Sequence, residues 1–321
     1  MGPGSSVSLH VRLPTLHRRA DTVPGPMLPT RIRCLHEIAR HSACPLGSQQ
    51  HDGAPRGDGV ARRRQAVGES GARARVKPVA VIPARWTATR FPGKPLALLA
   101  GRPLVVHVLE ACRRSGAFAE VRVATDDERI AAAVSSAGGL VERTRPDHPS
   151  GTDRVAEVTA RLPPAVEVVV NVQGDEPLVH PEALRALAAA FDDPAVEMAT
   201  LVRPLRDDER ARPDVVKAVL DLQSDALYFT RADVPFSRDG APLRRWAHQG
   251  LYGYRRRTLL RLAALPPTPL ELAESLEQLR ALENGIRIRC VPTSHPSIGV
   301  DTPEDLERAE ALLRGGPGTA G

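Results

Sequence analysis

A cluster of cationic side chains follows an early apolar run of the sequence. Val79–Ile82 is long enough for a buried strand and too short for a helix, and Pro83 ends it. The loop that follows carries Arg85, Arg90 and Lys94. Open α/β sheets bind ligands at the carboxyl ends of their strands, and Arg and Lys side chains there favour an anion such as a phosphate. A solvated basic loop is the structural alternative.

A stretch of small residues, Ser150-Gly151-Thr152-Asp153, precedes a predicted helix at Arg154–Arg161. Ser150 is of the residue type that caps helix N-termini, so a capped helix start explains the stretch as well as a binding role does. The functional alternative is that small residues with free backbone N–H groups let a base or a phosphate approach closely.

Two acidic residues are candidates for holding a cation. Val166–Val172 is nearly all β-branched and predicts a central strand that is buried on both faces. It runs into Gln173-Gly174-Asp175, which places a carboxylate at the strand tip, where a hard cation could sit over phosphates. A turn with solvated acids is the alternative. Asp301 precedes a helix that begins with T-P-E-D, and by itself it is more typical of a turn.

Strands and helices alternate through the first half of the body. Besides those named above, we expect strands at 121–124, 140–142 and 197–202, and helices at 103–115, 127–137 and 181–191. This rhythm is typical of βαβ units, so the predicted fold class is α/β and Rossmann-like, with a mostly parallel sheet and helices on both faces.

The rhythm changes from about Arg203. Strand-like segments at 215–220, 226–230 and 249–254 are separated by loops rich in Pro, Asp and Arg, which predicts an inserted, partly antiparallel subdomain over about 203–254. Aromatic residues gather there, as in an interface or a substrate lid. Thr268–Asn284 is predicted to be a single helix, with Leu270, Leu272, Leu276, Leu279 and Leu282 on its apolar side.

The composition changes at about residue 77 of the 321. Residues 1–77 hold 13 Lys and Arg against 5 Asp and Glu, so this segment accounts for the net charge of +6 and the remainder is slightly acidic. We therefore expect no nucleic-acid partner. We expect 1–77 to be a disordered basic leader, 78–315 the folded domain and 316–321 a flexible tail. A transit peptide, or upstream sequence translated from a misplaced start, are alternatives for 1–77.

Cysteine spacing and hydropathy indicate the cellular compartment of the protein. The four cysteines form neither a metal-ligand spacing nor a disulfide framework, which fits a reducing cytoplasm. The sequence contains no apolar run of about 18 residues, so we expect no membrane insertion.

Taken together, the motifs resemble one family. V-I-P-A-R, T-R-F-P-G-K-P-L, D-H-P-S-G-T-D-R, N-V-Q-G-D-E-P, A-L-Y-F-T-R, G-L-Y-G-Y-R and G-V-D-T-P-E-D-L occur in order between about Val79 and Leu313. They resemble the 3-deoxy-manno-octulosonate (KDO) cytidylyltransferase family. The resemblance implies a nucleotidyltransferase fold, a homodimer in the cytoplasm, and transfer of CMP from CTP to the anomeric hydroxyl of KDO with Mg²⁺.

The resemblance also implies roles for individual residues. Arg85, Lys94 and Asp175 would be catalytic, and Asp175 and Asp301 would ligate Mg²⁺. The nucleotide would be held by Ala84, Arg85, Arg90, Lys94, Ser150, Gly151, Arg154 and Asp175. The sugar would be held by Gln173, Arg231, His248, Tyr252, Glu277 and Gln278. We choose Arg231 as the partner of the sugar carboxylate, because an acidic sugar calls for an arginine.

Two alternatives stay open at this point. A cytidylyltransferase for another acidic sugar, of the 8-amino-KDO or sialic acid type, would keep the same nucleotide residues. A catalytically silent nucleotide-binding homologue would be expected to lack some of Asp175, Asp301, Arg85 and Lys94, and all four are present.

Overall fold

The computed structural model of the chain describes Gly2, residues 77–87 and residues 91–315. Apart from Gly2, these residues belong to one compact unit, Glu69–Gly321. Almost all of the predicted leader, the predicted tail and Arg90 lie outside the described residues.

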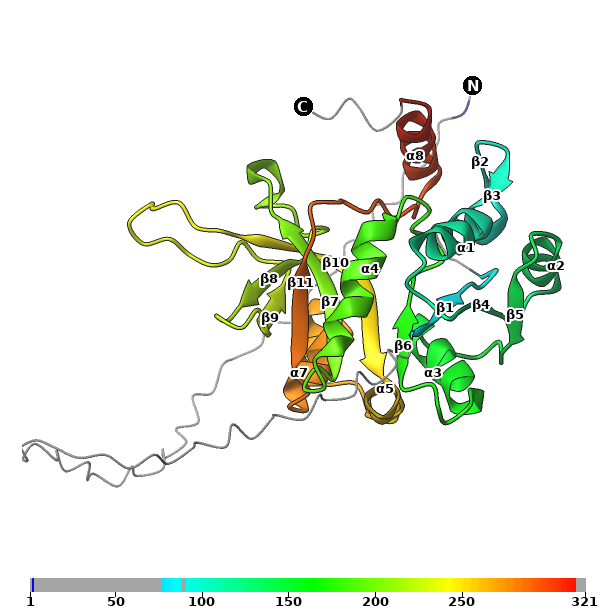
Figure 1. The fold of residues 1–321 in the computed structure, drawn as a ribbon. Coiled ribbons are helices and arrows are strands. Elements are labelled where there is room, and N and C mark those ends of the chain that lie inside the picture. The colour runs from blue at the N-terminus through cyan, green and yellow to red at the C-terminus, as the bar shows by residue number, and fades with distance from the viewer. Residues whose placement is uncertain (1, 3–76, 88–90, 316–321) are drawn as a thin grey trace, which may run out of the picture. The chain divides into compact units, whose positions relative to one another are not determined.

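The described strands form one mixed sheet and one small hairpin. The sheet has nine strands in the order β11-β7-β10-β6-β1-β4-β5, with β8 paired to β10 and β9 paired to β8 (Figure 1). Its strands are β1 (Val79–Pro83), β4 (Glu120–Thr125), β5 (Leu140–Arg143), β6 (Val168–Asn171), β7 (Met198–Pro204), β8 (Lys217–Leu220), β9 (Ala226–Thr230), β10 (Trp246–Arg255) and β11 (Ile288–Pro292). β1 is parallel to β4 and β6, β4 to β5, and β11 to β7, whereas β10 runs antiparallel to β6, β7 and β8. The predicted mostly parallel sheet is confirmed.

Helices cover both faces of this sheet, because successive side chains of a strand point to opposite sides. The helices are α1 (Leu104–Ser115), α2 (Glu128–Ser136), α3 (Gly151–Arg161), α4 (Pro181–Ala189), α5 (Arg256–Ala263), α6 (Pro269–Glu274), α7 (Gln278–Glu283) and α8 (Pro303–Gly315). In β1, Ala80 and Ile82 pack in a core with α1, α2 and α4. Val79 and Val81 pack in a second core with α3, α5 and α7.

The central strand and the helix ends follow the sequence signals. All four residues of β6 are buried, as a strand covered on both faces requires. Gly116 ends α1 with φ 62°, which a residue without Cβ adopts at low cost. Asp127 begins α2, where its carboxylate accepts hydrogen bonds from the N–H groups of Arg129 and Ile130.

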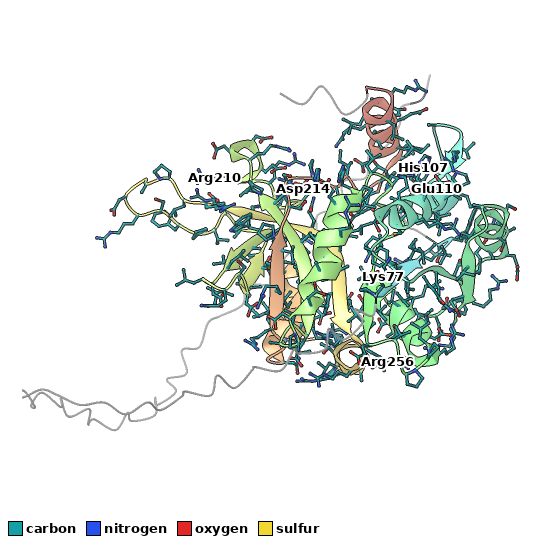
Figure 2. All side chains as sticks on the ribbon, in the orientation of Figure 1. Lys77, His107, Glu110, Arg210, Asp214 and Arg256 are labelled. Atoms are coloured by element: carbon teal, nitrogen blue, oxygen red, sulfur yellow. The ribbon has the colours of Figure 1, made fainter. Side chains whose placement is uncertain are left out.

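Shorter elements complete the described chain. They are a hairpin of β2 (Leu98–Leu99) and β3 (Arg102–Pro103) and the 3₁₀ helices η1 (Lys94–Leu96), η2 (Ala190–Asp192) and η3 (Asp207–Glu209). Arg256, at the start of α5, donates to the carbonyls of Leu162 (2.8 Å) and Ala160 (3.2 Å) and so ties α5 to the end of α3 (Figure 2). None of the helices in the described ranges has the length and hydrophobicity needed to span a membrane.

The single helix predicted for Thr268–Asn284 is wrong. The segment forms two short helices, α6 and α7, because Ser275 takes φ 52° and so leaves the helical region. The side chains of Leu270 and Leu272 are 41% and 68% exposed instead of lining a core. Leucines at helical spacing do not reveal such a break. The break leaves Gln278 buried at the start of α7.

The segment 203–254 contains the predicted antiparallel strands, but its last strand belongs to the main sheet. β8 and β9 pair with each other, and β8 pairs with the start of β10. β10 then continues between β7 and β6 in the middle of the sheet. The connection between β9 and β10 projects beyond the sheet (Figure 1). The insertion is therefore an extension of the sheet with a protruding loop.

Candidate active site

A pocket of about 370 Å³ opens where the predicted nucleotide residues meet, at the carboxyl ends of β1 and β6. We call it the strand-end pocket. It is lined by Pro83, Ala84, Arg85, Phe91, Lys94, Pro95, His148, Ser150, Gly151, Arg154, Gln173, Gly174, Asp175 and Asp301. Every predicted nucleotide or metal residue that the structure describes is in this list. The only one missing, Arg90, lies outside the described residues.

Lys94 joins the two acidic residues of the pocket. Its ammonium Nζ donates to Asp175 Oδ2 at 2.7 Å and to Asp301 Oδ1 at 2.9 Å. The loops carrying these carboxylates are also joined by backbone, since Val300 N donates to the Asp175 carbonyl at 2.8 Å. Residues far apart in the sequence therefore present two carboxylates at one place, as a cation site requires.

The protonation of Lys94 follows from these contacts. Burial opposes the charged ammonium, but the two carboxylates outweigh burial and raise the pKa of Lys94 above its ordinary value. The side chain is therefore positively charged at neutral pH. A fixed positive charge against the wall of the pocket suits a polyphosphate.

The start of α3 forms another part of the pocket wall. Ser150 caps the helix, since its hydroxyl accepts from Asp153 N (3.1 Å) and donates to Asp153 Oδ2 (2.7 Å). Arg154 is 2% exposed, and its Nη1 lies 2.8 Å from Asp126 Oδ1. The capped helix start predicted as an alternative is thus present, and it also faces the pocket. The two interpretations do not exclude each other.

Gly174 is required by a close approach of two backbones. A Cβ at this position would lie 2.7 Å from the Pro83 carbonyl oxygen at the end of β1. Such a contact with backbone cannot be relieved by a side-chain rotation.

Replacing Gly174 with alanine should therefore push the ends of β1 and β6 apart. We expect Gly174→Ala to lower Tm by about 5 °C, the effect of roughly 1–3 kcal/mol of overpacking in a domain of this size. It should also distort the strand-end pocket, which Gly174 lines. Gly299→Ala is the matched control, because nothing lies within 4 Å of a Cβ at Gly299. Equal Tm values for the two variants, measured by calorimetry, would contradict this interpretation.

An aromatic side chain that we did not predict as a site residue braces the basic loop. A Cβ at Gly93, which has φ 74°, would lie 2.7 Å from the Trp86 ring, so glycine is needed there. Gly93 N also donates to the Trp86 carbonyl at 3.0 Å. The guanidinium of Arg129 lies 3.3 Å from the centre of a Trp86 ring. Trp86 therefore fixes the residue that directly precedes Lys94.

Of the predicted sugar residues, one lines the strand-end pocket and the others lie outside its lining. Gln173 lines the strand-end pocket. Tyr252 lies opposite Asn171 on the neighbouring strand, and its ring is 5.4 Å from that of His248. Burial raises the pKa of Glu277, while a hydrogen bond with Thr152 opposes that rise.

Unpaired polar atoms mark the same region. Among the described residues, the buried nitrogens Gln278 Nε2 and Asn171 Nδ2 have no hydrogen-bond partner. Buried donors are normally paired, so these nitrogens are available to a polar ligand. Asn171 precedes the predicted residue Gln173 and was not singled out from the sequence.

His248 and Arg231 make contacts within the protein. His248 shares a 2.9 Å hydrogen bond with Thr200 Oγ1, and burial lowers the pKa of His248 to about 3, so its ring is neutral at pH 7. Arg231 does not line the strand-end pocket. Its guanidinium donates to the carbonyls of Glu274 and Pro213, both at 2.8 Å. In this structure Arg231, which follows β9, therefore contacts the segment before β8 and the end of α6 instead of presenting its fork to the pocket.

Two residues of the same motifs were missed. His148 lines the pocket and is hydrogen-bonded through Nε2 to Glu157. It belongs to D-H-P-S-G-T-D-R, so the motif carried the signal. Burial raises the pKa of Glu176, next to Asp175, to about 7, and Ser297 donates a hydrogen bond to Glu176 Oε2. No sequence pattern reveals that burial.

The fold and the pocket define a nucleotide-binding α/β protein with paired carboxylates beside a cationic loop. Residues 79–288 match the family model described as cytidylyltransferase. The chain belongs to the cytidylyltransferase family and, within it, to the 3-deoxy-manno-octulosonate cytidylyltransferases.

Two curated relatives illustrate this membership. The 3-deoxy-manno-octulosonate cytidylyltransferase of Myxococcus xanthus is 59% identical over 237 residues, which cover 74% of this chain and 96% of the relative. That of Geobacter sulfurreducens is 53% identical over 250 residues, covering 73% and 98%.

Solved structures agree with the fold. A CMP:2-keto-3-deoxy-manno-octonic acid synthetase complexed with CTP is 43% identical, with a TM-score of 0.71 over 74% of this chain and 99% of that chain. A 4-diphosphocytidyl-2C-methyl-D-erythritol synthase from Anaerococcus prevotii, 16% identical with a TM-score of 0.51 over 74% and 99%, shares the fold alone.

Proposed function

We propose that the protein transfers CMP from CTP to the anomeric hydroxyl of KDO and releases pyrophosphate. The observation that carries the proposal is the strand-end pocket, where Lys94 and Arg85 face the start of α3 and the carboxylates of Asp175 and Asp301. A relative of 43% identity has been solved in complex with CTP.

The chain's own residues would act mainly by position and charge. An anionic α-phosphate resists attack by an oxygen nucleophile until its charge is neutralised. Lys94 and Arg85 would supply positive charge along the triphosphate. The first turn of α3, with Ser150 and Gly151, would present backbone N–H groups to the nucleotide. Buried Arg154, paired with Asp126, would keep that wall in place.

The proposed cofactor is Mg²⁺, held by Asp175 and Asp301. The donor set fits, because carboxylate oxygens are the protein ligands that Mg²⁺ prefers, and both carboxylates already contact one cationic nitrogen. When bound, Mg²⁺ polarises a phosphoryl oxygen and lowers the pKa of an attacking hydroxyl. Lys94 would then give up part of its contact with the carboxylates, and its ammonium would be available to the phosphates.

The acceptor would lie beside the pocket, between Gln173 and the break that separates α6 from α7. Gln278 Nε2 and Asn171 Nδ2 are buried donors without partners in the described structure. A polyhydroxylated acid offers many acceptor oxygens to such donors. Tyr252 and Glu277 would complete this side.

The proposed activity is tested by pyrophosphate release from the full chain with CTP, Mg²⁺ and KDO. Parallel reactions would contain sialic acid or 8-amino-KDO in place of KDO, and EDTA would be the metal-free control. We expect release with KDO that stops on addition of EDTA and returns with excess Mg²⁺. Release with another acidic sugar alone would show that this sugar, and not KDO, is the acceptor. No release with any sugar would contradict the proposal.

We also propose a homodimer in the cytoplasm. The connection between β9 and β10 exposes Phe236 (87%) and Leu243 (40%), which offers apolar area to a second copy. Sedimentation analysis would test the assembly, and a monomer at micromolar concentration would contradict it.

A further inference from the structure

Three metal-ligating side chains meet outside the strand-end pocket. They are His180 and Glu182, at the start of α4, and His295, in the segment between β11 and α8. Their nearest ligand atoms all lie within 4.8 Å of one another. The two imidazole rings are stacked with centres 3.7 Å apart and an angle of 7° between their planes. Glu182 Oε2 lies 2.8 Å from His295 Nε2.

The backbone on both sides of this cluster is anchored. His180 is the N-cap of α4, where its Nδ1 accepts from the N–H of Glu182 at 3.2 Å. The carbonyl of His295 accepts from Gln249 Nε2 at 3.0 Å, and Gln249 is a buried residue of β10. The Gln249 contact holds the main chain of His295 and leaves its ring able to move, whereas a metal ion on His180 would replace the cap of α4.

One carboxylate stands beside the two imidazoles, and one cationic side chain flanks that carboxylate. Arg185 lies 3.5 Å from Glu182 Oε1, which leaves Oε2 directed at His295.

We propose that His180, Glu182 and His295 form a second metal site, which takes a transition-metal ion of the Zn²⁺ class. Two imidazoles and one carboxylate are a ligand set typical of Zn²⁺, and imidazole favours Zn²⁺ over the Mg²⁺ proposed for the strand-end pocket. Ligand atoms around tetrahedral Zn²⁺ stand about 3.4 Å apart, so the three ligand atoms, now within 4.8 Å of one another, must approach each other by roughly 1 Å. The two rings must leave their stacked arrangement to do so. The His180 cap of α4 is the contact given up.

An ion at this site would link the start of α4 to the segment between β11 and α8. Glu182 and His180 follow Asp175 in the chain, and His295 precedes Asp301. The same two segments are already joined by the hydrogen bond from Ser297 to Glu176 and by that from Val300 N to the Asp175 carbonyl (2.8 Å). Binding would therefore hold together the segments that carry the two carboxylates of the strand-end pocket.

Equilibrium dialysis of the untagged full chain against Zn²⁺, with Mg²⁺ in large excess, tests the site. We expect one ion per chain, beyond any held by residues 1–77, that is bound at least 30-fold more weakly in His295→Ala and Glu182→Gln. Zn²⁺ at about a hundred times its Kd should raise the wild-type Tm by roughly 5 °C and leave that of His295→Ala unchanged. Co²⁺ should give visible absorption bands in the wild type that the variants lack.

Two controls make the result specific. His107→Ala removes another partly buried histidine, one that contacts the Leu99 carbonyl, and should retain the ion (Figure 2). Asp175→Asn should also retain it, whereas loss of the ion in Asp175→Asn alone would place Zn²⁺ in the strand-end pocket and overturn the proposal. Equal affinity in the wild type and in His295→Ala would overturn it as well, since any histidines of residues 1–77 that bind Zn²⁺ are common to both.

Discussion

Asp175→Asn is expected to lower kcat by about 10³-fold while the fold persists, since removing one preorganised charge from such a site typically has an effect of this order. The amide has nearly the volume of the carboxylate, but it carries no charge for a metal ion or for the ammonium of Lys94, now 2.7 Å from Asp175 Oδ2. Lys94 keeps its contact with Asp301 (2.9 Å), so the loop retains one anchor. The rate of pyrophosphate release at saturating CTP and KDO measures the effect, and Mg²⁺ is raised until the rate is constant.

Asp208→Asn is the matched control for this change. The Asp208 carboxylate is 68% exposed and pairs with Arg206 at 3.3 Å, away from the pocket. Exposed pairs of this kind contribute little, so rate and Tm should both stay close to wild type. A near-normal rate in Asp175→Asn at saturating Mg²⁺ would remove Asp175 from the site.

Lys94→Ala is expected to raise KM for CTP by about 10- to 100-fold and to leave KM for KDO nearly unchanged, because a charged hydrogen bond contributes roughly 1.5–3 kcal/mol. The side chain is only 13% exposed, and its contacts with two carboxylates raise its pKa, so the wild type presents a full positive charge at neutral pH. Lys77→Ala is the control, since exposed Lys77 contacts only the Gly116 carbonyl (3.0 Å) in the hydrogen bonds described here (Figure 2). An unchanged KM for CTP in Lys94→Ala would contradict the loop assignment.

The same variant should respond more strongly to Mg²⁺ in the absence of CTP. Removing Lys94 leaves the carboxylates of Asp175 and Asp301 close together without the ammonium that now contacts both. Like charges at short range repel, and an added divalent cation relieves that repulsion. We therefore expect Mg²⁺ to raise Tm more in Lys94→Ala than in the wild type. An equal shift in both proteins would indicate that the carboxylates do not share a cation site.

Local patterns predicted the parts of the fold that depend on local physics. The β-branched run at Val166–Val172 predicted a strand buried on both faces, and β6 is one. The predicted helices at 103–115 and 127–137 correspond to α1 and α2, whose ends depend on the backbone conformation of Gly116 and on side-chain capping by Asp127, both of which involve only neighbouring residues. The prediction of one helix between Thr268 and Asn284 was wrong. The spacing of its leucines fits a single helix, but Ser275 adopts a left-handed backbone conformation that divides the segment in two.

The predicted site residues also differ in how far the sequence could place them. The order of the motifs was enough to select Arg85, Lys94, Ser150, Gly151, Arg154, Asp175 and Asp301, all of which line one pocket. The resemblance also placed Arg231 near the sugar, and this stays a prediction, because an arginine that donates to backbone carbonyls at 2.8 Å looks, in a sequence, like one that faces a ligand. The bracing of Gly93 by Trp86 was equally invisible, since it depends on where one ring lies.

The sequence by itself determined the fold class, the family and the chemical character of the residues that line the strand-end pocket, because periodicity, caps and ordered motifs are properties of neighbouring residues. Only the tertiary structure decided which distant residues meet. Lys94 bridges Asp175 and Asp301 because β1, β6 and the segment before α8 end at the same edge of the sheet. His295 stacks on His180, 115 positions earlier in the sequence, for the same reason. Contacts at such separation are set by the packing of whole elements, which no local pattern encodes.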